Sequence, residues 1–279
     1  MMYNVLSLGA GVQSSCLAFM AEKGEVTPKP DFAVFADTQA EPQQVYDYLE
    51  YLKDNVSFPV HVCTAGNLEK EAIVTRKATA NAKLYSEGEE YNIIQIPIFG
   101  RMPSGKITAA LGRTCTRDFK IRPIQRKIKE VTNLNTYTKA AKGAVTTWIG
   151  ISLDEITRMK PSQLKWIVNR HPLIELEMTR DDCINWLKKN NYKEPVRSAC
   201  YFCPFHSKDD WTYLKEKHPK EFDKAVKFDN DIRNKTKLHK NTKMEVYLHK
   251  SCKPLNEIDF SKEKEDYNFN NECEGMCGL

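Results

Sequence analysis

The sequence predicts an α/β fold, in which a parallel twisted sheet is flanked by helices and followed by a smaller, helical, cysteine-containing region. Short apolar runs alternate with stretches whose apolar residues recur at helical spacing, which is the pattern of βαβ units. The 279 residues are enough for one large α/β domain or about two ordinary ones. Hydrophobic residues make up 41% and charged residues 28%, so the chain can form a real core.

The first half of the chain carries the clearest alternation. We expect strands at 3–8, 32–36 and 59–63, separated by helices at 13–23 and 42–55. Residues 80–112 interrupt this alternation with Gly, Pro and Ser, so we expect an insertion or a lid there.

The alternation returns with a helix that opens at Pro123, a residue suited to the first helical position. A strand at 145–151 and an apolar segment at 172–176 follow. Thr179 and Asp182 then form a capping-box pattern, which predicts the start of another helix.

The pattern becomes shorter and richer in Cys and Lys after about residue 192. We therefore expect a first domain at 1–192, which includes the insertion, and a second region at 193–279. One amphipathic helix is expected in this region from Trp211, Leu214, Phe222, Ala225, Val226 and Phe228.

Several classes of protein are excluded by composition. No apolar run approaches the roughly 18 residues of a membrane span, and no basic segment precedes the apolar start as in a secretory signal. We expect a cytoplasmic protein in which the nine cysteines are metal ligands, redox thiols or core residues. The net charge of +5 permits an anionic partner without demanding one, and a homo-oligomer stays open.

A turn rich in small residues, SLGAGVQSS at 7–15, joins the first strand to the first helix. Gly9 and Gly11 permit positive φ and close backbone approach, and a helix N-terminus with nearby hydroxyls binds phosphate or sulfate. The turn is not a P-loop, because no Lys follows the second Gly. It is not GxGxxG either, because Ser14 replaces the third Gly. A turn that only packs the helix on the sheet is the alternative.

A basic segment, CTRDFKIRPIQRKI, occupies residues 115–128. Arg binds planar oxyanions through two hydrogen bonds and Lys adds a point charge, so the segment suits phosphate or sulfate. We expect Arg117, Lys120 and Arg122 to contact the anion, whereas Lys127 is expected to be solvated. The Lys-rich run 235–243 is a solvated loop or, alternatively, a nucleic-acid contact.

Four motifs in order resemble one known family. The turn at 7–15, FADT at 35–38, the basic segment and WIGISLDEITRMKP at 148–161 are similar to those of 3′-phosphoadenylylsulfate (PAPS) reductases and their PP-loop relatives in the adenine nucleotide alpha-hydrolase-like superfamily. The resemblance covers roughly residues 3–206. The last motif departs from the family pattern, because its Arg arrives only at Arg158.

The resemblance implies a Rossmann-like sheet that binds an adenine nucleotide, either ATP or an adenylyl sulfate, at the carboxyl ends of its strands. Asp37 and Thr38 would lie near the adenosine. The turn lacks the Asp of the usual Ser-Gly-Gly-x-Asp-Ser loop, which leaves a non-catalytic nucleotide-binding module as an alternative. The residues that would surround the phosphate or sulfate are Ser7, Gly9, Gly11, Gln13 and Ser14.

Three cysteines match a metal-binding pattern of related families. Cys200 and Cys203 form a CxxC, and Cys115 lies 85 residues upstream. Adenylylsulfate reductases hold a [4Fe–4S] cluster with a Cys-Cys pair and a distant CxxC, but Thr116 replaces the second member of the pair here. Three-Cys clusters are a feature of PP-loop tRNA thiolation enzymes, and a Cys-Thr segment with a distant CxxC also looks like the DNA phosphorothioation sulfurtransferases. The resemblance therefore implies an iron–sulfur cluster.

The fourth position of such a cluster would be open, or filled by Cys252 or a tail cysteine. Zinc is the alternative metal, because CxxC and HxxC are zinc-ligand patterns. Its ligands would be Cys200, Cys203, His249 and Cys252. Cys16, Cys63 and Cys183 lie in apolar patterns and are expected in the core.

The tail cysteines Cys273 and Cys277 complete the candidate catalytic set with Arg117 and Lys120. The expected function is ATP-dependent sulfur transfer to a nucleic acid, or a related modification, with a sulfur donor as partner. The alternative is reduction of an adenylyl sulfate. In that case Cys277 would be the nucleophile, as in the Cys-Gly-Leu terminus of sulfonucleotide reductases, and a thiol protein would donate the electrons.

Overall fold

The computed structural model describes residues 2–80, 86–108, 114–134, 141–236 and 244–262. Contacts divide these residues into two units. Unit 1 takes the chain up to Ala65 and Thr116–Ala199, and unit 2 takes Gly66–Cys115 and the residues from Cys200 onward. The segment that contains the expected insertion thus belongs with the C-terminal region. No helix in these ranges is long and apolar enough to cross a membrane.

Unit 1 is built on a five-stranded parallel sheet in the order β3-β2-β1-β8-β9, which confirms the predicted α/β fold. The strands are β1 (Tyr3–Leu8), β2 (Phe32–Asp37), β3 (Val60–Thr64), β8 (Val145–Ile149) and β9 (Ile167–Arg170). The sequence did not predict β9, because its four residues hold only two apolar ones. The apolar segment expected next is instead the short helix α5 (Pro172–Glu175).

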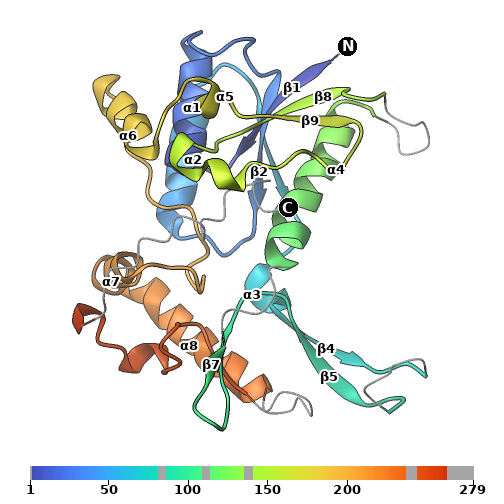
Figure 1. Ribbon diagram of the computed structural model, residues 1–279, viewed down its shortest axis with the longest axis vertical. Coiled ribbons are helices and arrows are strands. Elements are labelled where there is room, and N and C mark those ends of the chain that lie inside the picture. The colour runs from blue at the N-terminus through green and yellow to red at the C-terminus, as the bar shows by residue number, and fades with distance from the viewer. Residues whose placement is uncertain (1, 81–85, 109–113, 135–140, 237–243, 263–279) are drawn as a thin grey trace. The chain divides into compact units, whose positions relative to one another are not determined.

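Helices cover both faces of this sheet (Figure 1). The helices α1, α2 and α6 pack with Leu6 and Phe35 on one face, whereas α4 packs with Val5 and Val34 on the other. Because successive strand residues point to opposite faces, strands covered on both sides read as continuous apolar runs. These helices are α1 (Val12–Glu22), α2 (Gln43–Asp54), α4 (Arg122–Val131) and α6 (Arg180–Lys189). Cys16, Cys63 and Cys183 lie in these cores, as expected.

Two predicted helix starts are confirmed. Pro123 lies in the first turn of α4, which follows a π-helical turn, η1 (Thr116–Ile121). Thr179 caps α6 in a capping box: its side chain accepts from the Asp182 amide, and the Asp182 carboxylate accepts from the Thr179 amide.

Unit 2 combines small antiparallel sheets with helices. The strands β4 (Ile73–Lys77) and β5 (Glu90–Ile94) form a hairpin, and β10, β6 and β7 form a second sheet. The single helix expected from Trp211 to Phe228 is two helices, because Pro219 has no amide to continue the first. The remaining elements are α3 (Leu68–Glu71), β6 (Phe99–Arg101), β7 (Ile107–Thr108), α7 (Lys208–Lys217), α8 (Pro219–Thr236), β10 (Glu245–Tyr247), η3 (Leu255–Glu257) and η4 (Phe260–Lys262).

The capping box of α6 gives a first testable prediction. Thr179→Ala removes the acceptor of the Asp182 amide, so the free energy of unfolding should fall by about 1 kcal/mol in urea denaturation. Thr179→Ser is the matched control, because it keeps the hydroxyl, and it should unfold close to the wild type. Equal losses in both variants would show that the cap is not the source of the effect.

Candidate functional site

The turn between β1 and α1 lies at the carboxyl edge of the unit 1 sheet. Gly11 precedes the helix in an extended conformation, with φ −93°, and no side chain in the described part of the chain caps it. The left-handed residue of the turn is Ala10, with φ 56°. The sequence suggested positive φ at Gly9 and Gly11, but neither glycine adopts it. The first amides of a helix have no intrahelical partner, so α1 presents hydrogen-bond donors and its positive dipole end here.

Buried polar side chains surround this helix start. Ser7 Oγ and Gln13 Oε1 have no hydrogen-bond partner among the described residues, although both side chains are buried. Ser14 Oγ accepts from the Gly9 amide at 3.1 Å and donates to the Gly11 carbonyl at 3.4 Å. A buried polar atom without a partner costs about 1–3 kcal/mol, so these atoms mark the place of a ligand or an ordered water.

The segment after β8 lies against the start of α1. A Cβ on Gly150 would lie 2.9 Å from the Ser14 amide nitrogen, which only a glycine avoids. Gln13 Nε2 donates to Glu155 Oε2 at 3.2 Å, and Glu155 also pairs with Arg158 in η2 (Leu153–Arg158). Gly150 and Glu155 lie in the motif at 148–161, but the sequence did not reveal these contacts, because they join residues more than 130 positions apart.

Asp37 lies at the end of β2, as the resemblance implied. Its Oδ1 accepts two hydrogen bonds, from the Gln39 amide at 2.7 Å and from the Tyr46 hydroxyl at 2.8 Å. Thr38 is fully buried. The half-buried carboxylate of Asp37 is therefore the more accessible of the two predicted adenosine contacts.

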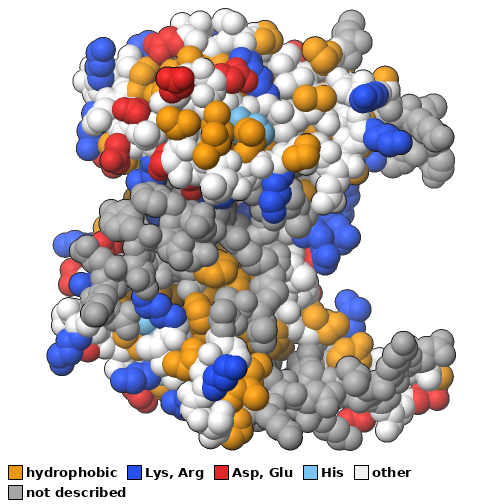
Figure 2. Space-filling model, viewed as in Figure 1, with side chains coloured by type: hydrophobic (Ala, Val, Ile, Leu, Met, Phe, Trp, Pro, Cys, Tyr) orange, Lys and Arg blue, Asp and Glu red, His pale blue; other side chains and the backbone are white. Residues whose placement is uncertain are grey.

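Two arginines of the basic segment share one acid. Arg117 binds Asp118 through two hydrogen bonds of 3.0 and 2.9 Å, and Arg122 reaches the same carboxylate at 2.7 Å. The hydrogen bond from Arg117 lowers the pKa of Asp118. Lys127, expected to be solvated, is partly buried and pairs with Glu130. On the face drawn in Figure 2, Lys and Arg side chains are interspersed with acidic and apolar ones.

Lys120 is buried rather than exposed. Its Nζ lies 3.4 Å from Glu41 Oε1, and Ser198 Oγ donates to the other carboxylate oxygen at 3.4 Å. Glu41 and Ser198 are also buried. The carboxylate thus joins the turn after β2, the π-helical turn η1 and the end of unit 1. Sequence reasoning missed Glu41, because nothing local marks it as the partner of Lys120.

The three matched cysteines all belong to unit 2. The Cys203 amide donates to the Cys200 carbonyl at 2.8 Å, so the CxxC is one closed turn, and the Cys115 amide donates to the Gln95 carbonyl at 2.8 Å. Across the described ranges, no group of three or more His, Cys, Asp or Glu residues could hold a metal ion. The CxxC turn therefore offers two thiols, and Cys115 is not gathered with them. Cys273 and Cys277 lie outside the described residues.

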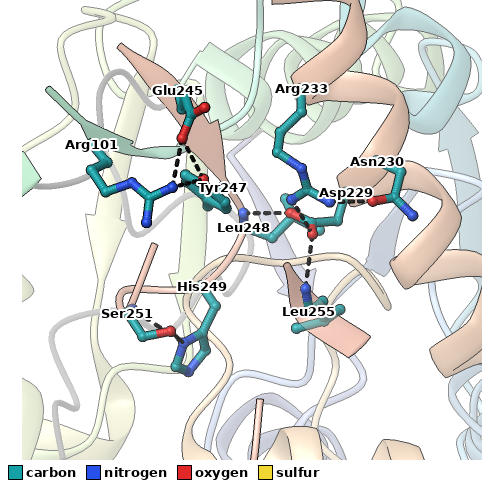
Figure 3. Close-up of polar contacts among 10 residues, drawn as sticks. All are labelled: Arg101, Asp229, Asn230, Arg233, Glu245, Tyr247, Leu248, His249, Ser251 and Leu255. Carbon is teal, nitrogen blue, oxygen red and sulfur yellow. Dashed lines mark hydrogen bonds and ion pairs between the residues drawn. The ribbon is translucent and has the colours of Figure 1, made fainter. Parts of the chain in front are cut away.

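A polar network fixes the segment that carries His249 and Cys252 (Figure 3). The buried carboxylate of Asp229 accepts from the Leu248 amide at 2.9 Å and from the Leu255 amide at 3.0 Å. Both ends of the segment are thereby held to α8.

The same segment tests the zinc alternative. His249 Nδ1 lies 2.8 Å from Ser251 Oγ and 3.2 Å from the Ser251 amide nitrogen. Cys252 is fully buried, and burial raises the pKa of its thiol. Within the described ranges, His249 and Cys252 belong to no group of three or more residues that could hold a metal ion.

Comparisons with known proteins identify no family for the chain. No family model matches it, and no curated protein matches it. Among solved structures it is similar to the U34-tRNA thiolase NcsA from Methanococcus maripaludis with its [4Fe-4S] cluster. The identity is 11%, the match covers 83% of this chain and 72% of that chain, and the TM-score is 0.37. At this score the likeness is slight, and the α/β fold follows from the strand order itself.

The contact at Gly150 gives a second prediction. In Gly150→Ala, the new Cβ meets backbone of Ser14 that cannot rotate away, so the start of α1 must shift. We expect a loss of about 1–3 kcal/mol in unfolding free energy, together with weaker binding of pyrophosphate in calorimetry. Gly24→Ala is the control, because it strains a left-handed residue in open space and should leave binding unchanged. Wild-type pyrophosphate affinity in Gly150→Ala would remove the helix start as the anion site.

Proposed function

We propose that the protein is an enzyme that binds an adenine nucleotide and uses ATP to activate a nucleic acid for sulfur transfer or a related modification. The observation that carries the proposal is the uncapped start of α1, where Ser7 Oγ and Gln13 Oε1 are buried without a partner in the described structure. It lies at the carboxyl edge of a parallel sheet, where open α/β folds bind nucleotides. The choice of adenine and of sulfur comes from the motif resemblance.

In this proposal, the helix start binds the phosphates of ATP. The amides of the first turn of α1 donate to phosphate oxygens, and the Ser7 hydroxyl adds a further donor. Arg117 and Arg122 are already oriented by Asp118 and are assigned to the anionic groups of the substrates. Lys120 pairs with Glu41 in the turn after β2, so its charge is assigned to the same carboxyl edge of the sheet.

The thiols of unit 2 are assigned to the handling of sulfur. Cys200 and Cys203 share one turn, which suits them to act as a pair. Cys115 would have to approach this turn before the three could hold a [4Fe–4S] cluster, since they are not gathered in the described structure. The assignment of sulfur chemistry therefore depends on the thiols themselves, and the cluster is a separate proposal with its own test.

The nucleotide that the protein prefers distinguishes ATP-dependent sulfur transfer from reduction of an adenylyl sulfate. We expect ATP to bind more tightly than adenylyl sulfate in calorimetry, and ATP to release pyrophosphate when a nucleic-acid acceptor is present. Gly11→Val should abolish binding while the fold survives, because Val tolerates the extended backbone of Gly11 but projects a side chain toward the phosphate. Release of sulfite from adenylyl sulfate would instead support the reductase, and failure to bind either ligand would overturn the proposal.

Iron tests the cluster. Protein purified without oxygen should contain iron and acid-labile sulfide, and Cys203→Ser should lose both because a hydroxyl does not replace a thiolate ligand. Cys183→Ser is the matched control, since Cys183 is buried in the unit 1 core and should keep the metal content. A colourless wild-type protein that holds zinc and no iron would contradict the cluster.

A further inference from the structure

We propose that Tyr46 is a positioning residue of the nucleotide site, which holds the Asp37 carboxylate so that one of its oxygens accepts a hydrogen bond from the bound nucleoside. This inference rests on the proposed function and adds to it a residue that none of the sequence motifs includes.

The orientation of Asp37 is set by two donors on a single oxygen. The Gln39 amide and the Tyr46 hydroxyl reach Oδ1 at 2.7 and 2.8 Å, one from the turn after β2 and the other from α2. Oδ2 has no hydrogen bond to any described residue, and the side chain is half exposed. A carboxylate oxygen can accept about two hydrogen bonds, so Oδ2 is the acceptor left for a ligand.

Tyr46 can serve only as a donor toward Asp37. Burial, and next the hydrogen bond to Asp37, raise the pKa of Tyr46 far above its usual range, so the phenol keeps its proton. The phenol's proton is directed at Asp37 Oδ1, which the Tyr46 hydroxyl reaches at 2.8 Å.

The turn between Asp37 and Tyr46 is itself anchored at Glu41. The Glu41 carboxylate bridges Lys120 and Ser198, each at 3.4 Å, and all three residues are buried. A buried ion pair therefore anchors the turn between β2, which supplies Asp37, and α2, which supplies Tyr46. An arrangement held at several points keeps a binding group oriented before the ligand arrives, which lowers the entropic cost of binding.

The sheet places Asp37 beside the predicted phosphate site. Phe35 pairs with Leu8, the last residue of β1, so Asp37 lies two residues beyond the end of that strand. Phe35 belongs to the core on the α1 side, and alternation along the strand puts Asp37 on the same face. A nucleotide whose phosphates bind at the start of α1 would thus extend its sugar or base toward this carboxylate.

The ligand must offer a hydrogen-bond donor to Asp37 Oδ2. The ribose hydroxyls and the exocyclic amine of adenine are both donors, whereas the oxygen at the same position of hypoxanthine is an acceptor and would face Oδ2 unfavourably. The site therefore discriminates through one group of the nucleoside, and nucleotide analogues that lack one donor each identify which group it is.

The experiment compares Tyr46→Phe with the wild type in calorimetric titrations of ATP, 2′-deoxy-ATP, 3′-deoxy-ATP and inosine triphosphate. For the wild type, one analogue should bind less tightly than ATP. In Tyr46→Phe, ATP should bind about tenfold less tightly, and the difference between ATP and that analogue should shrink, because Oδ2 is no longer held in place. Tyr51→Phe is the control on the same helix, since its hydroxyl only accepts from the Lys193 amide, at 3.3 Å, and its affinities should match the wild type.

Three outcomes would overturn the inference. Tyr46→Phe could bind every nucleotide like the wild type, or it could weaken all four equally, which would indicate a structural role alone. If Tyr46→Phe does not fold by circular dichroism, Asp37→Asn replaces it, because an amide nitrogen at the Oδ2 position must also abolish the discrimination. The third outcome is an Asp37→Asn variant that still discriminates between ATP and the analogue as the wild type does. A wild-type protein that binds none of the nucleotides would refute the proposed function itself.

Discussion

The site in unit 1 depends on the close approach of the chain after β8 to the start of α1. Gly150 lies so near the Ser14 amide that a Cβ would clash with backbone, and this approach lets Gln13 reach Glu155. The helix start is therefore covered on one side by protein and keeps its amides and the Ser7 hydroxyl for another partner. A bulkier residue at 150 would separate the two segments and remove the support of Gln13, so the proposed anion site depends on the same contact as the local packing.

Elements with strong local patterns could be predicted from the sequence, and elements decided by tertiary contacts could not. The strand at Tyr3–Leu8 and the capping box at Thr179 follow from apolar runs and from residue types at fixed offsets. The edge strand β9 has one covered side and too few apolar residues to show a period. The break at Pro219 had a visible signal, because a proline inside a helical pattern ends the helix before it.

The same division applies to the candidate site. Asp37 could be placed from its motif, but the buried contacts of Glu41 could not, since Glu41 joins Lys120 and Ser198 from 79 and 157 positions away. The basic segment shows a case where the signal was present. Asp118 and Arg122 stand four residues apart in a helical stretch, a spacing that favours an ion pair. Asp118 therefore already balances part of the positive charge of this segment, which is then less available to an anion.

The metal site proposed for the cysteines of unit 2 would have to be completed when the metal binds. Structural metal sites are often completed only on binding, because the binding free energy, on the order of 10–16 kcal/mol for zinc–thiolate sites, far exceeds the cost of rearranging one segment. The hydrogen bond from the Cys203 amide to the Cys200 carbonyl already closes the CxxC turn and brings the two backbones together. Bringing Cys115 to the turn would strain or break contacts such as the hydrogen bond from its amide to the Gln95 carbonyl. Each such hydrogen bond contributes about 1 kcal/mol. Metal binding could therefore supply the free energy needed to bring the third thiol to the turn.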